Sequence, residues 1–432
     1  MCGIVGYIGK EQAAPILLEG LARLEYRGYD SAGICVAENG VLDVAKCKGR
    51  LKNLAAMTEN GALLHGTAGI GHTRWATHGE PNDINSHPHV SQNGKVALVH
   101  NGIIENYLEI REFLEEKGVQ FTSQTDSEVV AQLLEYCLGL DEVHCMQDAI
   151  YMVLHRIEGA YAFGIVCADD PERIYAARKD APLLLGYGDG CNFIASDVTA
   201  LVKYTRDVSY MEDGEVAVLT RDSIQVFNAM ELPIEKEHYH IDWEISAAEK
   251  GGYPHFMLKE IMEQPEALRR AITPRVKDGR IDFGDLILSR QTIESFNRIM
   301  IVACGSSYHV GMLGKYTIEK LTRIPVEAVL ASEFRYCDPI VDDRTLVIVI
   351  SQSGETADTL AALREAKKLG AKILSIVNVV GSSIARESDH VMYTWAGPEI
   401  AVATTKAYST QLDVAYLIAL YFAKVRGQID EE

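Results

Sequence analysis

The sequence predicts two domains of different fold class, an α+β domain followed by an α/β domain with a doubly wound parallel sheet. At 432 residues the chain is longer than one ordinary hydrophobic core supports. In its first part, short apolar runs with hairpin-like spacing outnumber helical patterns, which is typical of antiparallel sheets covered by helices. In its last part, near-continuous apolar strands alternate with helical patterns, which is typical of buried parallel strands.

Residues 1–237 form the first predicted domain, and most of its expected elements are strands. The apolar runs predict strands over residues 3–8, 32–37, 69–72, 96–100, 161–168 and 173–177. Apolar residues at helical spacing predict helices over residues 107–117 and 127–138. The composition shifts near residues 228–250, which indicates a connector, and residues 238–256 are the predicted linker.

Residues 257–432 form the second predicted domain. A helix is expected over residues 257–272, followed by strands over 298–303, 345–351 and 372–377. Each strand is followed by a turn that contains glycine or serine and then by a helical pattern. A long apolar helix over residues 406–426 closes the chain.

The composition limits the classes of partner. The chain has 41 basic and 61 acidic residues, and its net charge of −20 repels nucleic-acid backbones and acidic membrane surfaces. The longest strongly apolar stretch, residues 414–423, is too short to span a bilayer. Neither nucleic acid nor a membrane is therefore expected as a partner.

The cysteines indicate a reducing compartment. There are nine of them, an odd number without a C-x-x-C pair, which favours free thiols over a disulfide framework. No signal peptide is expected before Cys2, because a catalytic role of this residue forbids a longer N-terminal extension that stays attached. A cytoplasmic location is the resulting expectation.

Cys2 is a candidate nucleophile that carries its own base. Removal of Met1 leaves one residue with both a thiol and a free α-amine. A cysteine thiol has a pKa of about 8.5 and an α-amine a pKa of about 7.7 to 8.0, so the amine can take the thiol proton at neutral pH. The alternative is that Cys2 is an incidental small residue after the start codon, and the rest of the chain decides between the two.

Two polar clusters in the first domain would serve such a nucleophile. In residues 71–79, Arg74 can hold a carboxylate through two parallel hydrogen bonds. In residues 100–106, the Asn101 side chain and the Gly102 backbone N–H can form an oxyanion hole. The alternatives are a surface ion pair for Arg74, a hairpin turn for Asn101-Gly102, and an ordinary helix N-cap for Asp126 or Ser127.

Taken together, these segments resemble the glutaminase domain of the class II, N-terminal-nucleophile amidotransferases. The matching segments are residues 2–6, 24–33, 71–79, 100–106 and 124–128. The resemblance implies a four-layer αββα fold, with Cys2 as nucleophile and Asn101 and Gly102 as the oxyanion hole. It further implies that Arg74 binds the α-carboxylate of L-glutamine and Asp126 its α-amine, and that further residues line the site: Trp75 as a gate for ammonia, Thr77, His78, Arg27 and Tyr29.

The turn after the strand at 345–351 suits a phosphate. It carries hydroxyls and free amides where a parallel strand ends and a helix begins, although such turns also serve purely as helix caps. The whole second domain resembles a sugar isomerase (SIS) subdomain, through residues 259–265, 303–308, 331–336, 351–356 and 403–406. The resemblance implies that the sugar phosphate is bound by Ser351, Gln352, Ser353 and Thr356, and that the sugar is contacted by Ser306, Ser307 and Val402.

With both domains taken together, the chain resembles the amidotransferases that aminate fructose 6-phosphate. They imply an enzyme that hydrolyses L-glutamine at Cys2 and uses the ammonia to form glucosamine 6-phosphate, the first step towards UDP-N-acetylglucosamine. They also imply a homodimer and no cofactor. Relatives continue into a second SIS subdomain and a tail that carry the ring-opening histidine, an enolising glutamate and a Schiff-base lysine, a role not expected of Lys406. The chain is therefore expected to be a fragment or to hydrolyse glutamine without completing synthesis.

Two alternatives concern other classes of site. A non-catalytic, sugar-phosphate-binding regulator built on an SIS domain would carry a basic DNA-reading element, whereas this chain is acidic. The histidine pairs His87/His89 and His238/His240 lack a further ligand at metal-binding spacing, so we expect solvated loop histidines and no metal.

Overall fold

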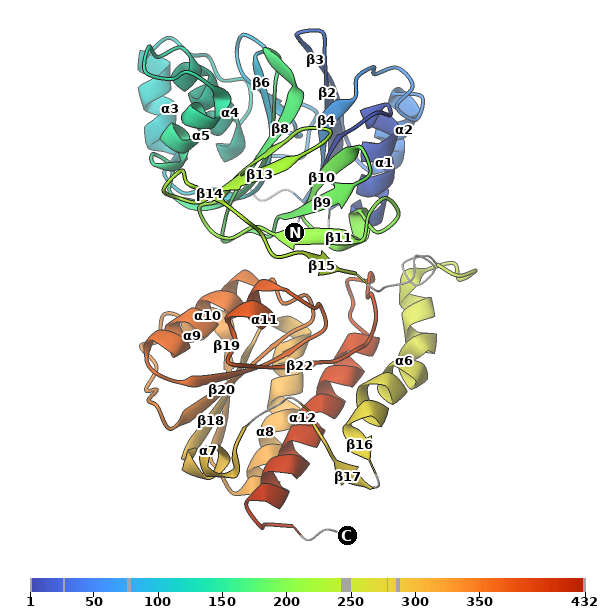
Figure 1. Cartoon of the computed structure of the whole chain (residues 1–432), viewed down its shortest axis with the longest axis vertical. Helices are drawn as coiled ribbons and strands as arrows, with labels where there is room; N and C mark the ends of the chain where they lie inside the picture. Colours follow the sequence, from blue (N-terminus) through green and yellow to red (C-terminus); the bar gives the residue numbers. More distant parts are fainter. Residues whose placement is uncertain are drawn as a thin grey trace. The chain divides into compact units, whose positions relative to one another are not determined.

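The structure, a computed structural model, describes residues 2–25, 28–75, 79–241, 250–277, 279–284 and 288–429. The chain divides into two compact units, Met1–Asp242 and Trp243–Glu432 (Figure 1). Each unit is described by itself.

The first unit contains two large antiparallel sheets. The eight-stranded sheet has the order β15-β11-β9-β10-β1-β4-β2-β3, with bounds Tyr239–His240, Asp207–Tyr210, Leu184–Gly188, Cys191–Ala195, Gly3–Ile8, Ala68–Arg74, Ser31–Glu38 and Val41–Lys48. The seven-stranded sheet has the order β14-β13-β12-β8-β7-β6-β5, with bounds Pro233–Ile234, Ile224–Phe227, Val216–Leu219, Asp170–Lys179, Gly159–Cys167, Val96–Ile104 and His89–Val90.

The two sheets pack face to face between layers of helices. One buried cluster joins Ile4 and Ile70 of the first sheet to Val99 and Ala176 of the second, as the inner faces of a sandwich do. Helices α1 (Ala13–Leu24) and α2 (Leu51–Met57) cover the outer face of the first sheet, and α3 (Tyr107–Glu116), α4 (Asp126–Leu138) and α5 (Met146–Leu154) cover that of the second (Figure 1). The expected four-layer αββα fold is confirmed.

Each strand predicted in this unit forms, but several elements were not expected. The helices α1, α2 and α5 were missed, as were the strands between residues 184 and 240. The N-cap of α1 is Gln12, whose side chain makes no capping hydrogen bond, so the helix lacks the Ser, Thr, Asp or Asn that usually marks an N-terminus. The stretch interpreted as a connector contains β14 and β15, which pair with β13 and β11.

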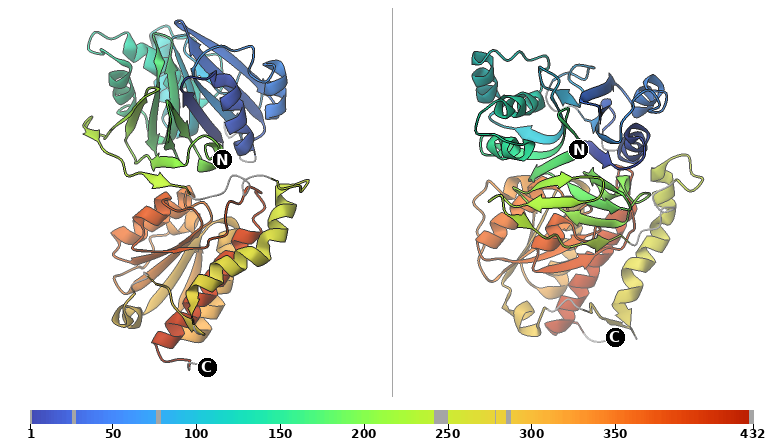
Figure 2. Two further views of the ribbon diagram at one scale, coloured as in Figure 1. Left: turned by 45° about the vertical axis from the view of Figure 1, so that its right-hand side comes forward. Right: turned by 45° about the horizontal axis from the view of Figure 1, so that its top comes forward.

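The second unit is built on a five-stranded parallel sheet in the order β19-β18-β20-β21-β22. The strands are Val326–Leu330, Arg298–Ala303, Thr345–Ser351, Lys372–Val377 and His390–Tyr393. Helices α7 (Arg290–Ser295), α8 (Gly305–Thr322) and α12 (Lys406–Val425) pack on one face, and α9 (Ala331–Phe334), α10 (Ala357–Lys368) and α11 (Ser383–Glu387) on the other (Figures 1 and 2). Helix α6 (Phe256–Ile272) runs along α12.

Burial on both faces explains why these strands are continuously apolar. In β20, Leu346, Ile348 and Ile350 face the cluster of α8 and α12, while Val347 and Val349 face that of α9 and α10. The bounds of β18, β20 and β21 are those that the sequence predicts. The doubly wound parallel sheet is confirmed. Among the described residues, no helix has the length and apolar character needed to cross a membrane.

Candidate functional site

Cys2 directly precedes β1, an interior strand of the first sheet, and lies next to the end of β4. The antiparallel register places Gly3 opposite Thr73, so the residue before Gly3 comes beside the end of the strand that carries Arg74. Gly3 is tightly enclosed, because a Cβ atom there would lie 2.7 Å from the Cβ of Leu24 in α1. The strand and the helix together therefore fix the position of the thiol.

The thiol of Cys2 is half-buried against the backbone of Trp75. The Trp75 N–H donates to the Cys2 Sγ at 3.1 Å, and the Sγ lies 3.5 Å from the Trp75 carbonyl oxygen. Burial raises the pKa of the Cys2 thiol, while the Trp75 N–H and the charge of Arg74 act in the opposite direction. A thiol in this setting needs a base to become a thiolate.

Asn101 and Gly102 lie within β6, at the edge of the second sheet, and do not form a hairpin turn. The Asn101 Nδ2 donates to the backbone oxygen of Cys2 at 3.1 Å, which joins the ends of the two sheets. Gly102 has a φ of +128°, and a Cβ there would lie 2.0 Å from the Ala160 oxygen, so this position requires glycine.

Arg74 and Asp126 bring opposite charges to the same region, and both side chains are almost fully buried. The Arg74 Nη2 donates to the Gly79 oxygen at 3.3 Å, and burial lowers the pKa of Arg74. Asp126 is the first residue of α4, and its Oδ2 accepts from the backbone N–H of Ile104 at 2.8 Å. Thr125 is the N-cap, so the N-cap alternative for Asp126 or Ser127 is wrong.

Two of the predicted lining residues are exposed aromatic side chains. Trp75 and Tyr29 are each 45% exposed, and their rings meet edge to face with centroids 5.1 Å apart. The other three predicted lining residues, Arg27, Thr77 and His78, lie outside the described residues.

A group of buried histidines lies next to Asn101, and no sequence pattern predicted it. The His72 ring stacks on His87 with centroids 4.2 Å apart, and His87 contacts His89 at 4.6 Å. The expectation that His87 and His89 are solvated is wrong, because both are buried. His238 and His240 are exposed, as expected. Among the described residues, no group of three or more His, Cys, Asp and Glu side chains is arranged to hold a metal ion.

In the second unit, the phosphate-type turn follows β20. The Ser351 Oγ accepts from the Gly354 N–H at 3.0 Å and lies 2.9 Å from the Thr356 Oγ1. The Ser353 Oγ accepts from the Glu355 N–H at 3.2 Å. Ser351 is buried, whereas Gln352, Ser353 and Thr356 are partly exposed. Two backbone N–H groups of the turn therefore donate to serine hydroxyls of the same turn.

The other predicted sugar contacts follow β18 and precede α12. The parallel register places Ala303 opposite Ile350, so the first turn of α8, with Ser306 and Ser307, lies beside the turn that begins at Ser351. The Ser307 Oγ donates to the Gln411 Oε1 at 3.1 Å. Val402 is 76% exposed, and the segment before it is held by Glu260, whose Oε1 accepts from the Ile400 and Ala401 N–H groups.

Lys406 forms its ion pair with helix α6 and not with a residue of these turns. The Lys406 Nζ is buried and forms an ion pair with the Glu263 Oε2 at 2.6 Å.

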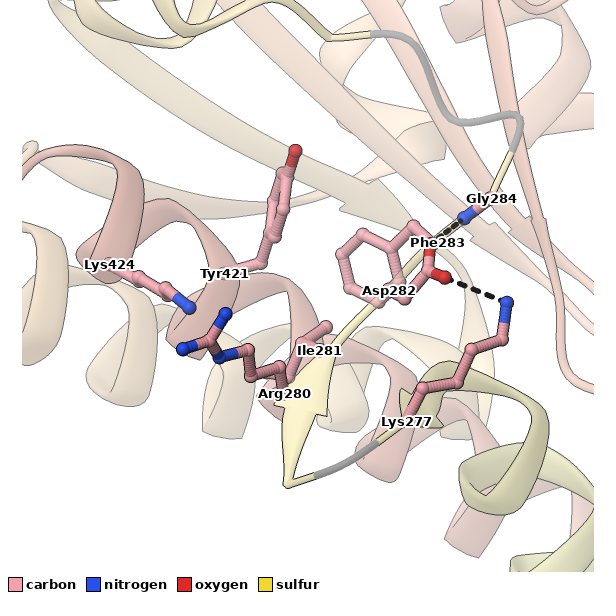
Figure 3. Close-up of a pocket in the computed structure, with 8 residues that line it drawn as sticks. All are labelled: Lys277, Arg280, Ile281, Asp282, Phe283, Gly284, Tyr421 and Lys424. Atoms are coloured by element: carbon pink, nitrogen blue, oxygen red, sulfur yellow. Dashed lines mark hydrogen bonds and ion pairs between the residues drawn. The ribbon is translucent and has the colours of Figure 1, made fainter. Parts of the chain in front are cut away.

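A cavity of about 390 Å³ is lined by Lys277, Arg280, Ile281, Asp282, Phe283, Gly284, Tyr421 and Lys424 (Figure 3). The Asp282 carboxylate there accepts from the Lys277 Nζ and from the Gly284 N–H.

Known proteins match this chain over its whole length. A glutamine amidotransferase domain model matches residues 72–203, and an SIS domain model matches residues 292–421. The glutamine–fructose-6-phosphate aminotransferase (isomerizing) of Clostridium tetani is 54% identical over 433 residues, which cover 100% of this chain and 70% of that protein. The protein of the same name from Caldanaerobacter subterraneus subsp. tengcongensis is 56% identical over 428 residues, 99% of this chain and 70% of that protein.

The chain belongs to the glutamine–fructose-6-phosphate aminotransferase family. A solved structure, the C-terminal domain of glucosamine-fructose-6-phosphate aminotransferase from Francisella tularensis, is 46% identical over 42% of this chain and 51% of that chain, with a TM-score of 0.41. Arg74, Asn101, Gly102 and Asp126 of this family member lie within the amidotransferase match, and Ser351 lies within the SIS match.

Proposed function

We propose that this chain hydrolyses L-glutamine at Cys2 and that the ammonia released converts fructose 6-phosphate into glucosamine 6-phosphate. The observation that carries the proposal is the hydrogen bond from the Asn101 amide to Cys2, which brings a donor for an oxyanion to the start of β1, where the thiol lies. Family membership supports both halves of the reaction.

The hydrolytic half proceeds through a thioester. With Met1 removed, the Cys2 amine takes the thiol proton, and the thiolate attacks the γ-amide carbon of glutamine. The second Asn101 Nδ2–H and the Gly102 N–H receive the oxyanion that forms on the amide oxygen. Return of the proton to the amide nitrogen expels ammonia and leaves a γ-glutamyl thioester. Water then hydrolyses the thioester to glutamate and regenerates the thiol.

The charged groups of the site orient the substrate. Arg74 would bind the α-carboxylate of glutamine and Asp126 its α-ammonium group, since both side chains are buried within the same region. Trp75 and Tyr29 would cover the bound substrate, together with Arg27, Thr77 and His78. Trp75 would also gate the release of ammonia.

The synthetic half would begin at the carboxyl edge of the parallel sheet. Strand β19 lies on one side of β18 and β20 on the other, so the turns after β18 and β20 meet where the direction of chain progression reverses. Open parallel sheets bind ligands at such a point. Ser351, Gln352, Ser353 and Thr356 would bind the phosphate, and Ser306, Ser307 and Val402 would contact the sugar.

The wider setting of the enzyme is also part of the proposal. We expect a cytoplasmic homodimer that needs neither a cofactor nor a catalytic metal, since the proposed steps use only side chains and backbone groups of the chain. Fructose 6-phosphate and glutamine are the expected substrates, and neither nucleic acid nor a membrane is an expected partner.

A paired assay tests the proposal on the 432-residue chain. Glutamate release and glucosamine 6-phosphate formation are measured together, with the intact mass recorded to establish whether Met1 is removed. Cys2→Ala should abolish glutamate release, and Arg74→Lys should raise the KM for glutamine at least about 10-fold, because lysine cannot form the paired hydrogen bonds. A glutamine-like electrophile should label Cys2, and hydrolysis that survives Cys2→Ala would refute the proposal. Binding of fructose 6-phosphate without glutamine hydrolysis would instead favour the sugar-phosphate-binding regulator.

A further inference from the structure

We propose that His72 is a positioning residue that fixes the orientation of the Asn101 amide in the oxyanion hole. This inference rests on the proposed function, because it concerns the same hydrolytic site. The His72 Nε2 lies 2.9 Å from the Asn101 Oδ1 and 3.1 Å from the backbone oxygen of His100. The two residues are 29 positions apart in the sequence, His72 on β4 of the first sheet and Asn101 on β6 of the second.

The two neighbours of the His72 Nε2 decide which ring nitrogen carries the proton. A backbone carbonyl oxygen only accepts hydrogen bonds, so the contact with the His100 oxygen requires a proton on the Nε2. The ring is neutral near pH 7, because burial, as the largest cause, lowers the pKa of His72 to about 3. His72 is therefore a neutral donor at the Nε2.

A donor at the Nε2 fixes which end of the Asn101 amide faces it. The atom of Asn101 that lies 2.9 Å away must be the acceptor, which is the Oδ1. The NH2 group then faces Cys2 and donates to its backbone oxygen at 3.1 Å, which leaves one N–H for an oxyanion. A flipped amide would place its oxygen beside the oxyanion and turn stabilisation into repulsion.

The surroundings of His72 keep its ring in place. His72 lies in the middle of the first sheet, in register with Ile4 of β1 and Gly33 of β2. One face of the ring stacks on His87, and the side chain is 1% exposed. The strand register holds the residue in place, and the two acceptors at the Nε2, more than the stacked ring, set the direction of its proton.

The first test compares two amide substitutions that differ in reach. In His72→Gln the side-chain NH2 can reach the position of the Nε2, whereas in His72→Asn it is about one bond too short. His72→Asn should lower the kcat for glutamine hydrolysis about 10-fold to 1,000-fold, the upper value being the loss of one oxyanion donor, with the KM for glutamine within about 3-fold. His72→Gln should retain the kcat within about 5-fold.

A matched control separates this effect from a general disturbance of the buried ring stack. His87→Gln changes the ring that packs on His72 and should leave the kcat within about 2-fold. Equal losses in His72→Gln and His72→Asn, or a change confined to the KM, would overturn the positioning role and leave a merely structural one.

The second test measures affinity for a mimic of the tetrahedral intermediate. The aldehyde of glutamate γ-semialdehyde forms a thiohemiacetal with a thiol, and its oxygen then occupies the oxyanion hole. His72→Asn should weaken inhibition by this aldehyde by the same factor as it lowers kcat/KM, and should leave inhibition by the product glutamate within about 2-fold. Unchanged inhibition by the aldehyde would overturn the proposal.

A measurement on the wild-type chain does not depend on whether the variants fold. Nitrogen NMR of histidine-labelled protein near neutral pH should show the His72 ring protonated at the Nε2 and bare at the Nδ1. A ring protonated at the Nδ1 would overturn the proposal. If Cys2→Ala still hydrolyses glutamine, the proposed function fails. If Cys2→Ala is inactive and His72→Asn has the wild-type kcat, only the positioning role fails.

Discussion

Lowering the pH from about 7.5 to about 5.5 should destabilise the first unit through its buried histidines. His72, His87 and His89 have pKa values far below the ordinary value of 6.5, and burial is the largest cause for each. The positive charges of Arg74 and Lys46 add to the effect at His89. The folded protein therefore resists protonation of these three rings, while the unfolded chain accepts protons freely.

The sign and size of the effect follow from this difference. Because the folded pKa values lie below the unfolded value, their contribution to stability is fully present above about pH 6.5 and is lost as the pH falls towards the folded values. Between about pH 7.5 and 5.5 only the unfolded state binds these protons. The free energy of unfolding therefore falls by about 1.4 kcal/mol for each histidine and by about 4 kcal/mol for the three. Ordinary carboxylates titrate below this window.

The assay compares the wild type with His87→Gln in the 432-residue chain. Urea unfolding is followed by pulsed hydrogen exchange of peptides from β4 and β6, so that the first unit is observed separately from the second. The free energy of unfolding of the wild type should fall by about 1.4 kcal/mol more than that of His87→Gln over the same pH change. Equal pH dependence in the two proteins would refute the assignment of His87 as a neutral, buried ring.

Two further predictions concern the second unit. Gly354 has a φ of +67°, and a Cβ there would lie 1.9 Å from the Ser382 Oγ, so Gly354→Ala should weaken fructose 6-phosphate binding at least about 10-fold by calorimetry. Gly370→Ala is the control, because its φ of +95° is also positive but its nearest neighbour would be an ordinary 3.8 Å away. Lys406→Met should lower the free energy of unfolding of the second unit by about 1–3 kcal/mol in urea, because it leaves Glu263 without its closest cation. Unchanged stability in Lys406→Met would show that the ion pair contributes nothing measurable.

Sequence patterns predicted the parts of the fold that are buried on both faces. Strands β1, β18, β20 and β21 are continuous apolar runs, because each is covered by another layer on either side. A continuous apolar run does not mark a strand that is little buried, such as β3, whose residues are half-buried or exposed. Sequence patterns also fail at α2, a helix of seven residues with only two buried side chains.

The candidate site was predicted as a set of residues and not as an arrangement. Cys2, Arg74 and Asn101 carry reactive or charged groups that the sequence makes visible, and the resemblance to a known family links them. Their proximity depends on how two sheets meet, which no local pattern encodes. The hydrogen bond between Asn101 and Cys2 spans 99 residues of chain.

His72 illustrates what a sequence pattern does not contain. It lies within a buried strand, and in the sequence a histidine there cannot be told from a core histidine that only makes a structural hydrogen bond. Its distinguishing feature is a fork of two acceptors around one nitrogen, and one of those acceptors is a backbone oxygen from the other sheet. The direction of a single proton thus depends on the packing of the sandwich, and the polarity of the Asn101 amide depends on that proton. A substitution that shifts the two sheets against each other should therefore reduce hydrolysis even where Cys2, Arg74 and Asn101 are all retained.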